Sequence, residues 1–395
     1  MEEPKVEEST SATATATAAA AAAAAATTRS LGGGPILSDM KVRDLIANNK
    51  RLVEVPHTAS LAYTMNALVA NRVIAVPVTA SPGNWIGAGG SMIVETDKQS
   101  GMVRKHYIGM VTMLDILAHI GGDDQMDGGD NVSDLDKKMS VPISSIIGRC
   151  LEGLSLWTFN PNTSILDCME VFSKGIHRAL VPLDHQMENI SGVELVESAV
   201  GYRMLTQMDL MKCLKANASD LQGILWQSLE EIGAIGETVY AISHSTKVID
   251  AIRCMRAALL NAVPIVVASN SDEEESKQLI NGKGKKLIGT FSATDLRGCH
   301  LATLQTWLPL SALEFTEQVG NSPLFANLNA PNVSPRELVT CHPDSSLAEV
   351  IDKVVAKHVH RIWVVTQHGN LVGLVSLSDI IRVMRAYLLL YPHAA

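Results

Sequence analysis

A hydroxyl residue followed three positions later by aspartate recurs at four places in the sequence, each time after a short apolar run. The four pairs are Thr112 with Asp115, Thr206 with Asp209, Ser292 with Asp295, and Ser376 with Asp379. Where a strand passes into a helix, such a hydroxyl lies beside unpaired backbone N–H groups that suit an anion. An aspartate in the first helical turn has two acceptor oxygens, which can accept both hydroxyls of a ribose. The pattern therefore suits a cradle for a nucleoside phosphate.

The same spacing also suits a purely structural role. A Ser or Thr N-cap with an acidic residue at the third helical position can form a capping box, and an acid in the first turn favours the helix dipole. For any one pair considered alone, capping is the simpler interpretation. A glycine stands three residues before the hydroxyl at Gly109, Gly289 and Gly373, where it allows close approach of another backbone or of a ligand. Arg203 replaces this glycine in the remaining unit and is expected to crowd its cleft.

Two His-Arg pairs could supply the positive charge that a phosphate beside the ribose needs. They are His177 with Arg178 and His360 with Arg361, each at the predicted start of a strand. Neighbouring strand residues point to opposite faces, so one member of each pair can face a cleft, and Arg suits bidentate contact with phosphate. A basic strand edge or a salt bridge is the structural alternative. The other two units have Asn71-Arg72-Val73 and Leu259-Leu260-Asn261 in the corresponding stretches, which favours one or two competent clefts rather than four.

Each hydroxyl-aspartate pair ends a longer unit that reads strand, helix, strand, strand, helix. In the last unit a strand at 338–340 precedes an amphipathic helix, with Ser346 as its N-cap and Glu349 as the capping-box partner. A hairpin around His368-Gly369-Asn370 then leads to a helix that includes Asp379. The earlier units have strands at 53–55, 157–159 and 239–241, with helices starting after Ser60, Ser164 and Thr246. The four aspartates lie 94, 86 and 84 residues apart, a period that suits a small repeated domain.

This order, with its glycine-led strand and final Thr/Ser-x-x-Asp, resembles the CBS domain family. Four copies in one chain resemble the gamma regulatory subunits of AMP-activated and sucrose-non-fermenting-type protein kinases, and most of all their plant gamma-like branch. The resemblance implies an α/β (α+β) fold of four β-α-β-β-α CBS repeats. Repeats one and two would pair into one module and repeats three and four into another, and the two modules would stack as a disc. The expected boundaries are 38–120, 143–215, 237–298 and 336–390, after a disordered Ala/Thr-rich tail at 1–36.

The resemblance also implies a function. The chain would be a non-catalytic regulatory subunit whose clefts sense AMP, ADP or ATP, and it would assemble with a kinase catalytic alpha subunit and a scaffold beta subunit. By the same resemblance the aspartates would hold ribose and the His-Arg pairs would contact phosphate, with Asp379 and Asp295 foremost, Asp115 next and Asp209 last. No cofactor beyond this regulatory ligand and no metal are expected. The alternative is a scaffold for kinase assembly that does not respond to nucleotides.

Composition and motifs narrow the function classes. A net charge of -9 without a basic stripe argues against nucleic acid, and 4% aromatic residues leave few stacking platforms for single strands. No nucleophile elbow, zinc-protease helix, Walker A loop or kinase loop set occurs, so an enzyme is not expected. The six cysteines are scattered without metal-ligand spacing, which indicates reduced, buried thiols. The acidic start suits neither a signal nor a transit peptide, and no apolar run is long enough to span a bilayer. We therefore expect a cytoplasmic or nuclear protein that does not bind membranes.

Overall fold

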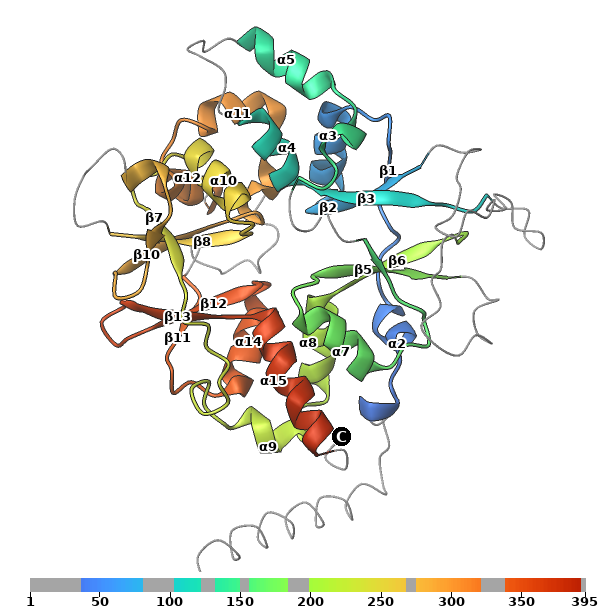
Figure 1. Cartoon of the computed structure of the whole chain (residues 1–395), viewed down its shortest axis with the longest axis vertical. Helices are drawn as coiled ribbons and strands as arrows, with labels where there is room; N and C mark the ends of the chain where they lie inside the picture. Colours follow the sequence, from blue (N-terminus) through green and yellow to red (C-terminus); the bar gives the residue numbers. More distant parts are fainter. Residues whose placement is uncertain are drawn as a thin grey trace, which may run out of the picture.

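The computed structural model describes residues 37–80, 103–121, 132–149, 156–183, 199–267, 275–320 and 338–391. The predicted disordered tail at 1–36 lies outside these ranges. Within them the predicted α/β fold is confirmed, because strand, helix, strand, strand is repeated four times (Figure 1). A further α-helix completes every unit except the third.

The two repeats in the first half of the chain have five elements each. Repeat one consists of β1 (Val55–Pro56), α3 (Leu61–Asn71), β2 (Ala75–Thr79), β3 (Tyr107–Thr112) and α4 (Met113–Ile120). Repeat two consists of β4 (Trp157–Thr158), α7 (Ile165–Ser173), β5 (Arg178–Pro182), β6 (Tyr202–Thr206) and α8 (Gln207–Ala216). We call these two repeats the first module.

The two later repeats form the second module. Repeat three consists of β7 (Tyr240–Ser243), α10 (Val248–Ala257), β8 (Ala262–Val266), β9 (Ile280–Asn281), β10 (Leu287–Ser292) and the 3-10 turn η7 (Asp295–Gly298). Repeat four consists of β11 (Thr340–Cys341), α14 (Leu347–Lys357), β12 (Arg361–Val365), β13 (Leu371–Ser376) and α15 (Leu377–Leu390).

A linker with short helices precedes each repeat. In chain order the linkers carry η2 (Leu37–Asp39) and α2 (Val42–Ile46), then α5 (Val132–Ser140) and η3 (Ile143–Ile146), then η5 (Ala218–Leu221) and α9 (Gln222–Leu225), and finally α11 (Leu301–Trp307) and α12 (Ala312–Gly320). Repeat three also contains η6 (Glu275–Lys277).

Local sequence explains how each unit folds. The hydroxyls of Ser60, Ser164 and Ser346 accept a backbone N–H from the third residue of the helix that follows, as the predicted N-caps should. In every repeat the first strand runs parallel to the second, and the second pairs antiparallel with the strand that ends at the capping hydroxyl, namely β3, β6, β10 or β13. In repeat three the short β9 pairs antiparallel with β7 as well. The buried apolar side chains of the helices then cover one face of each small sheet.

Each linker pairs with the other repeat of its own module. Isolated bridges join Lys41 to Ser164 and Ser60 to Pro142 in the first module. Bridges of the same kind join Ser228 to Ser346 and Lys247 to Ser311 in the second module. The linker before one repeat therefore lies against the first helix of its partner, which ties repeat one to repeat two and repeat three to repeat four.

Sheets meet within a module, and helices meet between modules. In the second module Val239, Val266, Trp363 and Leu371 share one buried cluster from both sheets. Across modules, α7 and α8 pack on α15 and α14 in one large core, while α3, α4 and α10 share the other (Figure 1). The repeats thus follow one another around the molecule in the order one, two, four, three. This is the disc of two modules that the resemblance to CBS proteins implies.

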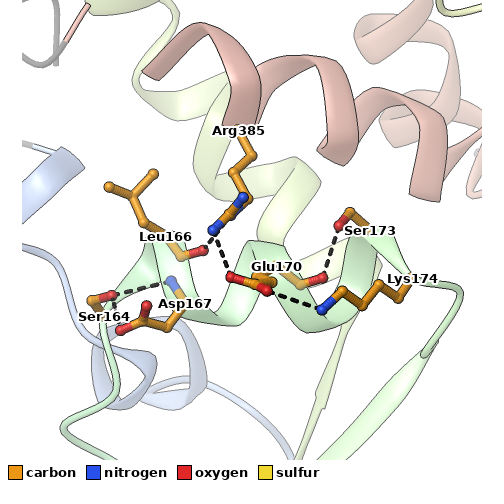
Figure 2. Close-up of polar contacts among 7 residues, drawn as sticks. All are labelled: Ser164, Leu166, Asp167, Glu170, Ser173, Lys174 and Arg385. Atoms are coloured by element: carbon orange, nitrogen blue, oxygen red, sulfur yellow. Dashed lines mark hydrogen bonds and ion pairs between the residues drawn. The ribbon is translucent and has the colours of Figure 1, made fainter. Parts of the chain in front are cut away.

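One arginine ties repeat four to repeat two at the helix interface. Arg385 of α15 donates to the backbone oxygen of Leu166 at 3.1 Å and to the carboxylate of Glu170 at 2.6 Å (Figure 2). Glu170 also pairs with Lys174 at 2.9 Å, one turn further along α7. The contact is partly exposed, so it adds orientation to an interface that is mainly apolar.

In repeat three Lys247 takes the N-cap position of α10, and the backbone oxygen of Thr246 accepts the Ala312 N–H of the neighbouring linker at 2.7 Å. The structure corrects two local predictions. The Glu349 carboxylate pairs with Lys353 at 2.7 Å instead of closing a capping box. Three of the four first strands begin one or two residues later than predicted, because each begins only where a neighbouring strand pairs with it.

The prediction of a final α-helix in repeat three is also wrong. The chain makes only the 3-10 turn η7 there, and Cys299 is already extended. Gly298 takes the position that Ala118, Lys212 and Arg382 occupy in the other repeats. Glycine destabilises a helix by roughly 1 kcal/mol relative to alanine, so the turn ends before an α-helix is established.

A left-handed residue follows the first helix of every repeat. It is Arg72 with φ 55°, Gly175 with φ 92°, Leu259 with φ 54° and His358 with φ 52°. A left-handed backbone costs a non-glycine residue about 1–2 kcal/mol of folding free energy. Glycine avoids this cost, but it loses about 0.5–1 kcal/mol more than alanine through the backbone entropy that folding removes. Repeat two therefore has the unstrained form of a turn that the other three repeats make under strain.

Replacing Leu259 with glycine should raise the free energy of unfolding by roughly 0.5–1 kcal/mol. The Leu259 side chain is 47% exposed, so little packing is lost. The matched control is Gly175→Ala, which should lower stability by about 1 kcal/mol, since an added Cβ meets no atom within 4 Å and only the backbone is strained. Urea unfolding measures both, and a loss of stability in Leu259→Gly would contradict the strain account.

Two further expectations bear on the chain as a whole. Cys168, Cys213, Cys299 and Cys341 are buried and unpaired with one another, and burial raises the pKa of Cys213 to about 11 and of Cys341 to about 12. Such thiols are unreactive at neutral pH. The predicted burial is confirmed for these four cysteines, whereas Cys254 is half-buried and Cys150 lies outside the described ranges. Among the described ranges no helix combines the length and the apolar character that a membrane crossing requires.

Candidate functional site

All four hydroxyl-aspartate pairs lie where the last strand of a repeat ends. The backbone N–H of the hydroxyl residue donates to the aspartate Oδ2 at 2.8 Å in Thr112, 2.9 Å in Thr206, 2.7 Å in Ser292 and 3.0 Å in Ser376. In three repeats the hydroxyl also donates to that oxygen, at 2.6, 2.7 and 2.6 Å, and it accepts the backbone N–H of the aspartate, which completes a capping box. One carboxylate oxygen therefore serves the cap. A sugar would have to be held mainly by the other oxygen, Oδ1.

The four aspartates differ in exposure. Asp115 is fully buried and Asp295 is 2% exposed, whereas Asp209 and Asp379 are half-buried. The Oδ1 atom of Asp379 lies 3.7 Å from the guanidinium of the partly exposed Arg382. The carboxylates that solvent reaches therefore belong to repeats two and four, while those of repeats one and three are enclosed.

Strand register identifies equivalent positions without ambiguity. The residue that pairs with the capping hydroxyl is Ala75, Arg178, Ala262 and Arg361 in repeats one to four. The residue before it, whose oxygen accepts the first N–H of the following segment, is Ile74, His177, Asn261 and His360. This corrects the stretches compared in the sequence: the His-Arg position of repeat one is 74–75 rather than 71–73, and that of repeat three is 261–262.

Side chains from three repeats meet at the centre of the disc. Arg361 Nη1 donates to the backbone oxygen of Ala262 at 3.2 Å, and Asn261 Nδ2 lies 3.4 Å from His177 Nδ1. Burial, and next the charge of Arg361, lower the pKa of His177 to about 4. Burial lowers the pKa of Arg361 to about 10, opposed by the carboxylate of Asp379. We call His177, Asn261, Arg361 and Asp379 the central cluster; His360, by contrast, is exposed.

The glycines before the hydroxyls face linkers. A Cβ on Gly109 would lie 2.4 Å from Ile147 Cγ2, and one on Gly373 would lie 2.7 Å from the backbone oxygen of Gly236. Ile147 and Gly236 both precede the partner repeat in the module, so the close approach predicted at these glycines is made by a linker: by the Ile147 side chain at Gly109 and by the Gly236 backbone at Gly373. Arg203 stands at the equivalent position of β6, where it pairs with Val181 across the sheet and is half-buried.

The linker before repeat one reaches repeat two through a side chain. Asn49 Nδ2 donates to the backbone oxygen of Met204 at 2.8 Å and lies 3.4 Å from Asp209 Oδ2. Asp209 is therefore contacted by the linker as well as by its own cap. The sequence gives no signal for this contact, since Asn49 lies 160 positions away.

Sequence reasoning singled out the hydroxyls, the aspartates and the His-Arg pairs, but it did not identify the contacts that join His177 and Arg361 to repeat three. Asn261 belongs to the central cluster because its side chain lies beside His177, and no sequence motif identifies it. The left-handed residue lies two positions before the His-equivalent position in every repeat, and this constant offset would have fixed the register. Only Gly175 among the four is a glycine, so the signal was visible in one repeat alone.

Comparison with known proteins agrees with the sequence resemblance. The CBS domain model matches residues 332–386. The Arabidopsis thaliana protein "SNF1-related protein kinase regulatory subunit gamma-like PV42b" is 59% identical over 89% of this chain and 96% of its own length, and PV42a from the same plant is 57% identical over the same shares. These relatives are named as regulatory subunits, which agrees with the prediction that this chain is not an enzyme. Protein MJ1225 from Methanocaldococcus jannaschii, 16% identical with a TM-score of 0.54 over 87% of this chain and 99% of that chain, has the same fold.

Proposed function

This chain belongs to the gamma-like regulatory subunits of SNF1-related protein kinases, and from that premise we propose that it binds an adenine nucleotide and reports its presence to a kinase complex. The nucleotide would be AMP, ADP or ATP. The complex would contain a catalytic alpha subunit and a scaffold beta subunit. Any phosphoryl transfer would belong to the catalytic subunit.

The observation that carries this proposal is the central cluster. A phosphate needs a cation that stays charged, and Arg361 meets that need even with its lowered pKa. His177 and Asn261 add donors or acceptors from two other repeats, and the partly exposed Asp379 can accept from a ribose hydroxyl through Oδ1. One nucleoside phosphate could thus bridge three of the four repeats.

The two halves of the disc differ in what they can offer such a ligand. Repeats two and four have arginine opposite the capping hydroxyl, and their aspartates are half-buried. Repeats one and three have alanine there, and their aspartates are buried. In our proposal the ligand contacts are therefore those of repeats two and four together with Asn261 of repeat three, while Thr112, Asp115, Ser292 and Asp295 serve as caps.

A ligand at the central cluster could bias the arrangement of the modules. His177 belongs to the first module, and Asn261, Arg361 and Asp379 belong to the second. Binding that draws these groups together favours one packing of the modules over another, and only such a difference in affinity can transmit a signal. A kinase complex in contact with both modules would then sense nucleotide occupancy.

A nucleotide-insensitive scaffold is the second candidate, and a specific observation favours it. Every aspartate already uses Oδ2 for its own cap, and Arg361 already donates to Ala262. Under this account the polar groups of the centre are fully used in holding the disc together. The chain would then contribute only assembly to the kinase complex.

Thermal shift with two matched variants separates the candidates. In the sensor account, AMP, ADP or ATP at about 100 times its dissociation constant adds about 2.7 kcal/mol of stability, and Asp379→Asn removes most of that shift. Asp167→Asn is the control, because its carboxylate accepts from Ser164 at 2.6 Å as Asp379 accepts from Ser376, but on the first helix of repeat two. Each variant should cost roughly 1 kcal/mol or less through its weakened cap. Equal loss of the nucleotide shift in both variants would contradict the assignment of Asp379.

Assembly is tested separately by co-expression with kinase alpha and beta subunits. The proposal expects a stable complex that survives gel filtration. A complex that forms without any thermal shift from nucleotides would support the scaffold instead. A shift without a complex would leave nucleotide binding intact and reject the kinase partner.

A further inference from the structure

A buried amide crosses the boundary between the modules at the two polar caps. Gln207, the first residue of α8, is 3% exposed. Its Nε2 donates to the hydroxyl of Ser378 in α15 at 2.8 Å and to the backbone oxygen of Phe172 at 3.0 Å. From these contacts we infer that Gln207 is the positioning residue through which occupancy of the repeat-four cap is transmitted to repeat two. This inference rests on the proposed function.

The location of Gln207 connects the groups that would contact a ligand. Its backbone N–H donates to the oxygen of His177 at 3.2 Å, and it follows the capping residue Thr206 directly. Its partner Ser378 stands between the cap Ser376 and Asp379 on the other module. A ligand that pulls on Asp379 therefore displaces the group to which Gln207 donates. A shift of Gln207 in turn displaces both the Thr206 cap and the backbone of His177.

Burial makes this connection stiff. A hydrogen bond shielded from water is electrostatically stronger, and a buried amide left without its acceptor carries the full cost of desolvation. Water cannot replace Ser378 at so enclosed a position without reopening the interface. The amide must therefore follow the serine when α15 moves.

The equivalent positions in the other half of the disc have no such contact. Gln207 corresponds to Met113 in repeat one and to Ala293 in repeat three, both apolar. Met113 is 1% exposed and packs in the core that repeats one and three share. Repeats one and three therefore meet through apolar packing at this level, while repeats two and four meet through a directed donor. At this position the directed donor lies in the half of the disc that also has Arg178 and Arg361.

Hydrogen exchange with and without AMP tests the inference on the full chain, with ATP as a second probe. In the wild type, nucleotide should slow amide exchange at the start of α15 and, by about fivefold or more, at the start of α8. Gln207→Met keeps the volume and removes the donor, and Ser378→Ala removes the acceptor. Both should retain the protection of α15 and lose that of α8. Ser378→Thr keeps a hydroxyl and should retain both.

Each other outcome rejects the inference or the function on which it rests. Protection of α8 that persists in Gln207→Met means that the ligand contacts repeat two directly, and it overturns the inference while nucleotide binding stands. Protection confined to α15 in the wild type also overturns it. Absence of any nucleotide-dependent protection, at concentrations up to millimolar, overturns the proposed function itself. If a variant shows faster amide exchange throughout the chain without ligand, it is destabilised as a whole. The comparison of Ser378→Thr with Ser378→Ala then tests the inference, because only the threonine keeps the hydroxyl that accepts from Gln207.

Discussion

Acidification from pH 7 to pH 4 should remove about 3 kcal/mol of unfolding free energy through His177 alone. The folded protein keeps this imidazole neutral, because burial and then the charge of Arg361 lower its pKa to about 4, against about 6.5 in an unfolded chain. Between those two values the unfolded chain binds a proton that the folded chain does not bind, so stability falls as pH falls. Below pH 4 both states are protonated and this contribution no longer changes.

The variant His177→Asn isolates the effect, since asparagine stands at the equivalent position of repeat three and does not titrate. Urea unfolding of the wild type and the variant at several pH values gives the difference in stability at each pH. As the pH falls from 7 to 4, the wild type should lose about 3 kcal/mol of unfolding free energy relative to the variant. A difference independent of pH would show that His177 is solvated or protonated in the folded protein, and that the centre of the disc is more open than described.

Gly373→Ala should destabilise the protein by about 3 kcal/mol. A Cβ at this position would lie 2.6 Å from Ile235 Cγ2 and 2.7 Å from the backbone oxygen of Gly236. The linker cannot move aside cheaply, because Gly236 and Leu374 exchange two backbone hydrogen bonds of 2.8 and 3.0 Å. Relief of the clash therefore requires loss of the bonds that hold the linker of repeat three on repeat four.

Gly201→Ala is the matched control. Its added Cβ would meet only Leu183 Cδ1 at 3.8 Å, an ordinary contact, so stability should change by about 0.5 kcal/mol or less. Chemical denaturation of both variants measures the contrast. If Gly373→Ala were as stable as Gly201→Ala, the linker would not lie on the third strand, and the pairing of repeats within a module would need another explanation.

Local patterns made much of the fold predictable. The hairpin of repeat four is determined by its apolar runs and its Gly-containing turn, and Gly369 indeed has a φ of 77°. The caps at Ser60, Ser164 and Ser346 depend only on residues three positions away, so sequence sufficed. The missing helix of repeat three shows the limit of this reasoning, because one residue, Gly298, ends it.

The central cluster could not be derived in this way. His177, Asn261 and Arg361 lie far apart in the sequence. They meet only because each linker packs on the other repeat of its module and because helices pack between modules. Strand register determines which side chain faces the centre of the disc, and a shift of one residue would turn that side chain to the opposite face of the sheet. The left-handed residues Arg72, Leu259 and His358 have no local signature, so the register was not visible in three repeats.

Equilibrium binding of AMP and ATP, measured by isothermal titration calorimetry on the full chain, tests the central claim most directly. The account predicts saturable binding of one or two nucleotides per chain. It also predicts loss of binding in Arg361→Ala, which introduces the residue found at positions 75 and 262, and retention in Arg385→Ala, which removes an arginine from the helix interface instead. No saturable binding at millimolar nucleotide, or equal affinity in the wild type and Arg361→Ala, would contradict a nucleotide-sensing centre.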